Sequence, residues 1–334
     1  MDLQDSYAGK NVLITGGLGF IGSSLARQLV DWHASVTLMD SAIDGLGANN
    51  FNLAGIEGRV SIDRNDIRNP DAVKRAVANK AVVFDLAAQV DYKRSNREPF
   101  VDASINFIGH QNVIEACRAE NPGCRIVFPG SRTQYGRIKD SDLPVKEDHP
   151  LETLNPPSAY TAHKTAVEML LNLSNRVHGL SSVVLRLTNP FGPRAQIRNS
   201  SYCVLNWFIG QAIQGNPLTI FGDGEQLRDY VYIDDVVQAL AVAGVHPNPK
   251  SRIYNVGSGE HISFKAMAEQ IAELTGVEIK NVPYPENQRG FETGHFYADV
   301  SRAKEELGWK AATSFRVGLE RTVAYYQENL GKYL

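Results

Sequence analysis

The sequence predicts an α/β protein, in which a doubly wound parallel sheet is followed by a smaller C-terminal α+β lobe. Its 334 residues leave room for two domains. Short runs rich in Val, Ile and Leu recur in the first half without strict polar alternation, which is typical of strands buried on both faces of a parallel sheet. Segments with helical spacing separate these runs, so the strands are joined by crossover helices. The predicted strands are 11–15, 35–40, 59–63, 81–86, 125–129 and 182–187, and the predicted helices are 20–32, 70–79, 100–120 and 158–178.

The regular alternation ends near residue 190. Beyond it, the sequence predicts helices over 203–214 and 264–274 and short strands over 218–221 and 230–233. We therefore expect a first domain over residues 1–190, with a return segment near 229–256. The remainder of 191–334 is expected to form the smaller lobe.

Charge and cysteine content exclude several classes of protein. The net charge is -3 and no block of five like charges occurs, which argues against a nucleic-acid partner or a polybasic membrane surface. The three cysteines, Cys117, Cys124 and Cys203, have no CxxC spacing, so we expect no metal site and a reducing compartment. No apolar run approaches the ~18 residues of a membrane span. These features predict a cytoplasmic protein with no membrane partner.

A glycine-rich loop directly follows the first predicted strand and reads Thr15-Gly16-Gly17-Leu18-Gly19-Phe20-Ile21-Gly22. From Gly17 it fits G-x-G-x-x-G, in which the glycines let the backbone approach a pyrophosphate at a helix N-terminus. The second strand ends at Asp40, 24 positions after Gly16, where an acid can bind ribose hydroxyls. A glycine-rich turn with an incidental acid is the alternative. No Arg or Lys follows Asp40 to neutralise a 2′-phosphate, so the loop favours NAD over NADP.

A second motif lies on the helix predicted over 158–178, with Ser158 as its N-cap and Gly179 as its stop. Tyr160 and Lys164 are four residues apart and therefore share a face. A cation ~4 Å from a phenol at an effective dielectric constant of ~20 lowers the phenol pKa by roughly three units, enough for a base near neutral pH. Alone, this spacing more often describes a surface tyrosine with a solvated lysine. The expected core face of this helix comprises Ala162, Ala166, Met169, Leu170, Leu173 and Val177.

These two motifs are accompanied by further motifs in the order typical of one family. On these motifs, the chain resembles the extended short-chain dehydrogenase/reductase family, in its NAD-dependent nucleotide-sugar epimerase and dehydratase branch. The resemblance covers nearly the whole chain. It rests on the glycine loop and Tyr160-x-x-x-Lys164, together with Asp66-Ile67-Arg68, Leu86-Ala87-Ala88-Gln89, Asn106, 131–136, 186–194 and 221–230. It implies a Rossmann-like fold, bound NAD, and a homodimer formed through the helices predicted over 100–120 and 158–178.

The resemblance also implies roles for individual residues. The catalytic set is Tyr160, Lys164 and Ser131. The NAD site comprises Gly16, Gly19, Phe20, Ile21, Gly22, Asp40, Asp66, Ile67, Leu86, Ala87, Ala88, Tyr160 and Lys164. The substrate, a nucleotide-diphospho-sugar with UDP-hexose favoured, would meet Ser131, Asn189, Leu218, Phe221, Arg228, Arg289 and Glu292.

The reaction implied is epimerisation, most simply at C4, through transient oxidation to a keto-sugar. Tyr160 would take the proton from a sugar hydroxyl while hydride passes to NAD and then returns to the other face. Dehydratases of the family carry an Asp-Glu pair directly after the catalytic Ser/Thr, whereas this chain has Arg132 and Thr133. The alternatives are a reductase, decarboxylase or dehydratase of the same fold, or a non-catalytic NAD-binding protein.

Overall fold

Seven parallel strands form one sheet in the computed structural model of the chain, which describes residues 2–247, 249, 252–284 and 294–334. The strand order is β11-β6-β5-β4-β1-β2-β3. These strands are β1 (Asn11–Thr15), β2 (Ser35–Met39), β3 (Val60–Asp63), β4 (Val82–Asp85), β5 (Arg125–Ser131), β6 (Ser181–Leu187) and β11 (Ile253–Val256). The predicted Rossmann-like α/β fold is confirmed.

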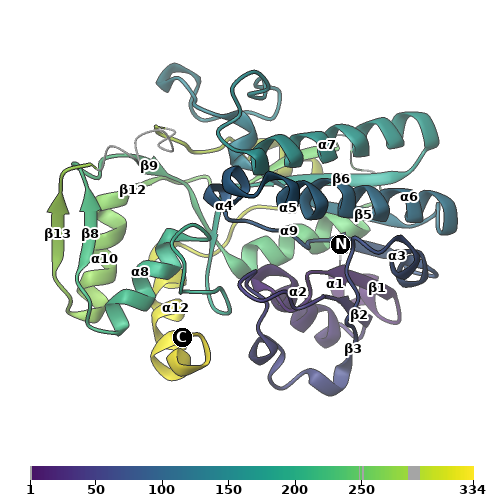
Figure 1. Cartoon of the computed structure of the whole chain (residues 1–334), viewed down its shortest axis with the longest axis horizontal. Helices are drawn as coiled ribbons and strands as arrows, with labels where there is room; N and C mark the ends of the chain where they lie inside the picture. The colour runs from purple at the N-terminus through teal and green to yellow at the C-terminus, as the bar shows by residue number, and fades with distance from the viewer. Residues whose placement is uncertain (1, 248, 250–251, 285–293) are drawn as a thin grey trace.

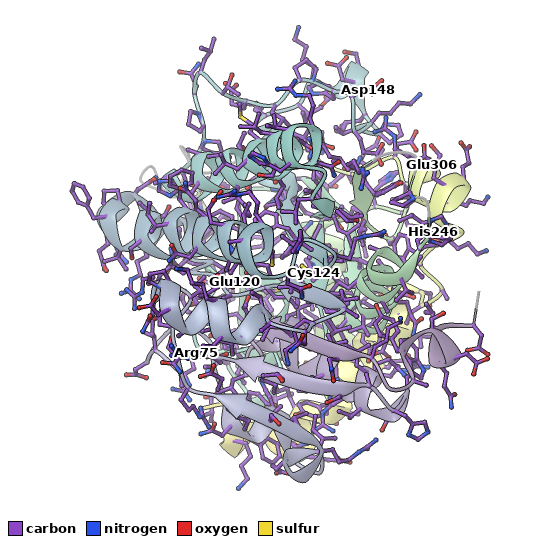
Figure 2. The ribbon with its side chains drawn as sticks, turned by 90° about the vertical axis from the view of Figure 1, so that its right-hand side faces the viewer. Arg75, Glu120, Cys124, Asp148, His246 and Glu306 are labelled. Atoms are coloured by element: carbon purple, nitrogen blue, oxygen red, sulfur yellow. The ribbon has the colours of Figure 1, made fainter. Side chains whose placement is uncertain are left out.

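Helices cover both faces of this sheet. On one face lie α3 (Pro70–Val77), α5 (Pro99–Ala103), α6 (His110–Glu120) and α7 (Ala159–His178), and on the other lie α1 (Leu3–Tyr7), α2 (Phe20–Asp31) and α9 (Ile233–Val245). Alternate residues of each strand supply the two cores: Val12 and Ile14 pack towards α2 and α9, whereas Leu13 packs towards α3 and α6. Figure 2 shows Arg75 and Glu120 on one side, and His246, which directly follows α9, on the other.

The helix predicted over 100–120 has a more complex form. It begins as α5, passes through a π-helical segment, η3 (Ser104–Gly109), and continues as α6. A short helix, α4 (Tyr92–Arg97), precedes it and was not predicted, because its sequence YKRSNR has no apolar face. Asp91 is the N-cap of α4 and accepts hydrogen bonds from the backbone N–H groups of Lys93 and Arg94.

The smaller lobe lies beside the carboxyl ends of the central strands, on the left of Figure 1. It contains β8 (Leu218–Phe221) paired in parallel with β13 (Ile279–Val282), and β9 (Leu227–Arg228) paired antiparallel with β12 (Ile262–Ser263). Helices α8 (Val204–Ile213), α10 (Phe264–Thr275) and α12 (Phe315–Asn329) pack together beside them. The same half also contains the pair β7 (Asn189–Phe191) and β10 (Tyr230–Tyr232), together with α11 (Ser301–Leu307) and the short helix η7 (Leu330–Lys332).

Helix α7 has the predicted ends but only part of the predicted core face. Ser158 Oγ accepts a hydrogen bond from the Thr161 N–H, and Gly179 ends the helix in the left-handed conformation. Its buried residues are Thr161, Lys164, Thr165, Val167, Glu168, Leu171 and Ser174, whereas Met169, Leu173 and Val177 are exposed. Of the expected core face, Leu170 packs against the core, but Met169, Leu173 and Val177 were predicted wrongly, since the buried side of this helix also carries polar groups that are satisfied by hydrogen bonds or ion pairs.

One of those groups is Glu168, which forms a buried ion pair with Arg186 of β6. The Arg186 Nη2 to Glu168 Oε1 distance is 2.5 Å, and a second bond from Nε to Oε2 measures 3.0 Å. Arg186 also donates to the Tyr135 hydroxyl and the Glu147 carbonyl. Both side chains are at most 4% exposed, so water cannot solvate either charge if its partner is lost.

The segment after α12 returns to the first strand-helix unit. The buried Tyr333 hydroxyl donates to Asn52 Oδ1 at 2.6 Å, and Asn52 Nδ2 donates to the Leu18 carbonyl at 2.9 Å. Arg198 Nε donates to the Tyr333 carbonyl. Residue 333 therefore supports, through one asparagine, the glycine-rich loop near the other end of the sequence.

None of the described helices combines the length and apolar character needed to cross a bilayer. Within the same residues, no three His, Cys, Asp or Glu side chains gather in a group that could hold a metal ion.

The ion pair gives a test of the fold. Arg186→Met should lower the free energy of unfolding by about 3–5 kcal/mol, because it leaves the Glu168 carboxylate buried without its partner. Urea denaturation followed by circular dichroism measures the change. Glu168→Gln combined with Arg186→Met should be less destabilised than Arg186→Met alone. Arg59→Met, which breaks an exposed pair with Asp31, is the control and should cost less than about 1 kcal/mol.

Candidate active site

The glycine-rich loop turns from β1 into α2 with its backbone close to the segment that directly follows β4. Gly16 has φ of +69°, and a Cβ atom on it would lie 2.8 Å from Ala87 Cα. Only glycine fits this position without strain or collision. Gly19 is the N-cap of α2, and no side chain caps the first amides of this helix. These N–H groups are left for an anion at the positive end of the helix.

Two aspartates follow the next two strands of the sheet. Asp40 Oδ2 accepts a hydrogen bond from the Leu18 N–H in the glycine loop, and its Oδ1 accepts one from the Ala42 N–H. Asp66 is held by Arg68, with 2.7 Å between Nη2 and Oδ2, and hydrogen bonds from Arg68 and Ser41 overcome its burial to lower its carboxyl pKa. Arg68 is thus held in an ion pair with Asp66.

A cavity of about 670 Å³ connects this loop to the smaller lobe. The residues expected in the NAD site that line this cavity are Gly16, Gly19, Phe20, Ile21, Gly22, Asp40, Asp66, Ile67, Leu86, Ala87, Ala88, Tyr160 and Lys164. The residues expected in the substrate site that line it are Ser131, Asn189, Phe221 and Arg228. The structure therefore brings together nearly all of the predicted site residues.

Leu218 is an exception, and its prediction was wrong. It is 1% exposed and belongs to the hydrophobic core rather than to the cavity wall. Side chains alternate along β8, so Leu218 and Ile220 point inward while Thr219 and Phe221 line the cavity. Arg289 and Glu292 lie outside the described residues.

Tyr160 and Ser131 meet at the wall of this cavity. Tyr160 is in the first turn of α7, where its backbone N–H donates to Ser95 Oγ of α4. Ser131 ends β5, and its own N–H donates to the side chain of the buried Gln134 at 2.7 Å. Ser131 lies close enough to the Tyr160 phenol to act on its pKa, and its own Oγ lies 2.9 Å from Thr133 Oγ1. Burial raises the pKa of Tyr160 above its usual value and nearby Asp102 raises it further, while Ser131 opposes both.

Lys164 lines the same cavity as these two residues and is 2% exposed. Its ammonium group donates to the Pro129 carbonyl at 3.2 Å and lies 5.9 Å from the centre of the Tyr160 ring. Burial lowers the pKa of Lys164 to about 8, although Asp85 and Asp102 act to raise it. Burial thus weakens the cation on which the expected lowering of the phenol pKa depends.

Cationic and aromatic groups line the end of the cavity near the smaller lobe. Arg132 Nε donates to Asn189 Oδ1 at 3.0 Å, and Asn189 Nδ2 donates to the Asp229 carbonyl at 2.7 Å. Arg228 donates to the Leu227 carbonyl at 2.9 Å while lining the cavity. The Phe221 ring lies 5.8 Å from that of Tyr284 in an edge-on arrangement.

Several cavity residues were not expected from the sequence, namely Lys93, Thr133, Tyr202, Trp207, Gln226 and Tyr284. Lys93 comes from α4 and Trp207 from the predicted helix α8, whereas the others come from turns and loops, and the family resemblance assigned none of these residues to the site. Among the described residues that line the cavity, the carboxylates are Asp40 and Asp66, both at the end next to the glycine loop.

Comparisons with known proteins agree with this geometry. A family model described as "NAD dependent epimerase/dehydratase family" matches residues 12–257. The chain is 32% identical to a putative UDP-glucose 4-epimerase of Methanocaldococcus jannaschii, over 95% of this chain and 99% of that one. The structure resembles a UDP-glucose 4-epimerase of Thermotoga maritima solved with UDP-glucose, with a TM-score of 0.85, 30% identity, and 96% and 99% of the two chains covered.

A dehydratase has a similar structure. The dTDP-glucose 4,6-dehydratase DesIV of Streptomyces venezuelae, solved with NAD bound, has a TM-score of 0.84 and 27% identity over 96% of this chain and 98% of that one.

The glycine loop gives a test of dinucleotide binding. Gly16→Ala should weaken NAD binding at least tenfold, or about 1.4 kcal/mol, because the added methyl group collides with the backbone at Ala87 and displaces the loop. Isothermal titration calorimetry measures the affinity. Gly9→Ala is the matched control: Gly9 has φ of +72° but nothing within 4 Å of its Cβ position, so this variant introduces the backbone strain alone. Equal affinities of the two variants would contradict the prediction.

Proposed function

The chain belongs to the NAD-dependent epimerase/dehydratase family, and on that basis we propose that it epimerises a nucleotide-diphospho-hexose at C4. The observation that carries this proposal is the group formed by Ser131, Tyr160 and Lys164 at the wall of the cavity. A hydroxyl, a phenol and an ammonium group there surround one point at which a sugar hydroxyl can be deprotonated.

The cofactor fits the residues present. The uncapped amides of α2 and the close approach of Gly16 to the segment after β4 suit a pyrophosphate, and Asp40 suits the adenosine ribose. When bound, NAD supplies an oxidised nicotinamide ring that accepts hydride from the sugar and returns it.

Side chains of this protein transfer the proton of the sugar hydroxyl. Ser131 Oγ hydrogen-bonds the reacting sugar oxygen, and Tyr160 accepts its proton and later gives it back to the keto-sugar. Burial favours the protonated phenol, so the ionised form depends on positive charge nearby. Lys164 supplies part of that charge. Because its pKa is about 8, Lys164 is mostly protonated at neutral pH but loses its charge in moderately alkaline solution.

The nucleotide end of the substrate is assigned to the smaller lobe. We propose that Arg228 binds the diphosphate, with Asn189 beside it, and that Phe221 lies against the base. A UDP-hexose is the favoured substrate, and the similar proteins named UDP-glucose 4-epimerase support this choice. Residues 191–334, apart from the return to the sheet, then form the substrate lobe.

Dehydration is the second candidate, because a dehydratase is among the structurally similar proteins. Removal of water from the sugar requires an acid and a base besides Tyr160. In this chain Arg132 and Thr133 follow Ser131, and the carboxylates among the described cavity residues lie at the opposite end. This arrangement favours epimerisation.

The test is direct. Incubation of the protein and NAD with a panel of UDP-, GDP-, CDP- and dTDP-hexoses should convert one of them into its C4 epimer without net NADH, as resolved by NMR. Tyr160→Phe should lower kcat about 10²–10⁴-fold while NAD still binds. Tyr297→Phe removes the hydroxyl of a tyrosine whose ring centre lies 4.2 Å from that of His261, and it should retain full activity. A dehydrated or reduced product would favour the second candidate.

We also propose that the protein is a homodimer. The exposed side of α7 carries Met169, Leu173 and Val177, and the adjoining α5 and η3 expose Phe100 and Ile108. Phe100 is 88% exposed, and a large apolar stripe of this kind marks an association surface.

A charge placed in this stripe tests association. Met169→Glu with Leu173→Glu should convert the dimer into a monomer, because two like charges would have to be buried in a symmetric interface. Sedimentation velocity reports the mass. Val317→Glu places the same charge at a half-exposed valine of α12 and should leave the mass unchanged. A dimer that survives both substitutions would rule out this surface.

A further inference from the structure

Ser131 is held by the short helical turn that follows it, η4 (Arg132–Tyr135). Its backbone N–H donates to Gln134 Oε1 at 2.7 Å, and its Oγ accepts a hydrogen bond from the Thr133 N–H at 3.2 Å. Ser131 and Gln134 form a capping box, in which the first residue of a turn and the residue three positions later bind each other's backbone N–H groups. Both the backbone and the hydroxyl oxygen of Ser131 are therefore fixed.

The other end of the Gln134 side chain is also bound. Gln134 is 0% exposed, and its Nε2 donates to Glu168 Oε2 of α7 at 2.9 Å. A carboxylate accepts hydrogen bonds but has none to donate, so the amide nitrogen of Gln134 must face Glu168 and the amide oxygen must face Ser131. The charge of Glu168 thus fixes the orientation of the Gln134 amide.

Glu168 is itself held in the core by its ion pair with Arg186 of β6. Arg186 also donates to the hydroxyl of Tyr135, the residue after Gln134, at 2.8 Å. The Tyr135 hydroxyl in turn donates to Asn255 Oδ1 of β11 at 2.6 Å. Two consecutive residues of η4 are therefore tied to α7, β6 and β11, which leaves the turn little freedom to move.

Gly130, the residue before Ser131 in β5, leaves the space that the Gln134 amide occupies. A Cβ atom on Gly130 would lie 2.7 Å from Gln134 Oε1, closer than Cβ atoms approach other atoms in proteins. It would also lie 3.1 Å from Arg186 Cγ. Any side chain at position 130 would therefore compete with the hydrogen bond between Gln134 and Ser131.

Helix α7 connects this network to the reactive phenol. Tyr160, Lys164 and Glu168 follow one another at intervals of four residues, so they share one face of the helix. Tyr160 and Lys164 line the cavity, whereas Glu168 is 2% exposed and belongs to the ion pair in the core. The helix that carries the phenol therefore also carries the carboxylate that holds Ser131 through Gln134.

We propose that Gln134 is a positioning residue which, anchored by Glu168, keeps Ser131 in register with Tyr160. This inference rests on the proposed function, because it concerns the serine that binds the reacting sugar oxygen. A hydrogen-bond donor that is placed before the sugar binds stabilises charge on that oxygen without reorganisation. A displacement of about 1 Å in such a group can lower a rate about 10²-fold.

The first experiment measures kcat and KM for Gln134→Met, which keeps the length of the side chain and removes both of its hydrogen bonds. We expect kcat to fall about 10–100-fold. The KM for the nucleotide sugar should change less than about twofold, because the nucleotide end is bound elsewhere. Gln270→Met makes the same substitution in α10, where the buried amide oxygen of Gln270 has no hydrogen-bond partner among the described residues, and it should leave kcat unchanged.

A double-mutant cycle separates positioning from a general effect on structure. If Gln134 acts through the Ser131 hydroxyl, its substitution has nothing left to displace once that hydroxyl is removed. Gln134→Met should therefore change the residual kcat of Ser131→Ala less than about twofold. A full additional loss in the Ser131→Ala background would overturn the proposal.

Gly130→Ala disturbs the same contact from the other side, since the added methyl group collides with Gln134 Oε1. Its kcat should fall as in Gln134→Met. Gly123→Ala is the matched control, because Gly123 directly precedes β5 and has nothing within 4 Å of its Cβ position. An unchanged kcat in Gly130→Ala would overturn the role given to the bond between Gln134 and Ser131.

A measurement without substrate or NAD separates this inference from the proposed function. Hydrogen exchange of the Ser131 amide is followed by NMR in protein containing isotopically labelled serine, and the signal is assigned by its absence in Ser131→Ala. The amide should be protected in the unsubstituted protein and exchange at least about tenfold faster in Gln134→Met. The buried Ser23, whose N–H donates to the Gly19 carbonyl at 3.0 Å, is the internal control and should not change.

The two proposals can fail separately. If exchange at Ser131 accelerates while no nucleotide sugar is converted, the anchoring of Ser131 by Gln134 stands and the proposed reaction fails. If the Ser131 amide is unprotected in the unsubstituted protein, or exchanges equally fast in Gln134→Met, the inference is overturned even in an active epimerase.

Discussion

The ammonium group of Lys164 is almost completely buried, and much of the site is arranged around it. Burial of an isolated charge is costly unless it is paired and hydrogen-bonded. Here the Pro129 carbonyl accepts a hydrogen bond from it, the centre of the Phe128 ring lies 4.3 Å away, and two carboxylates lie nearby. These partners come from β4, β5 and α5, while the lysine comes from α7. Four elements must therefore be in place before the charge can be tolerated.

The parallel sheet explains how such distant residues meet. Its strands end at one edge, so the glycine loop after β1, the Ala87 backbone after β4 and Ser131 at the end of β5 all reach the same cavity. Tyr160 joins them because α4 supplies hydrogen-bond acceptors to the first amides of α7. The chemistry of the site thus depends on backbone groups as much as on the reactive side chains.

Periodicity and motif spacing predicted the sheet, the glycine loop and the Tyr160–Lys164 pair, because each depends on local sequence. Three features did not follow from local sequence. The core face of α7 was only partly predicted, since its inner side mixes apolar residues with polar groups such as Glu168, which is satisfied by the distant Arg186. Leu218 was assigned to the substrate site by the family resemblance alone, which does not show that alternation along β8 turns its side chain into the core. The distance between the Lys164 ammonium group and the phenol depends on tertiary packing and not on the spacing of four residues.

The hydrogen bonds from Tyr333 to Asn52 and from Asn52 to Leu18 join segments 281 residues and 34 residues apart in sequence. Contacts of such long range form late, because the intervening chain must first be ordered. During biosynthesis, the dinucleotide loop emerges early but cannot acquire its final support until Tyr333 has been translated. A nascent chain that lacks Tyr333 would expose a cofactor loop without this support, so the order in which the two segments are synthesised sets when the loop is complete.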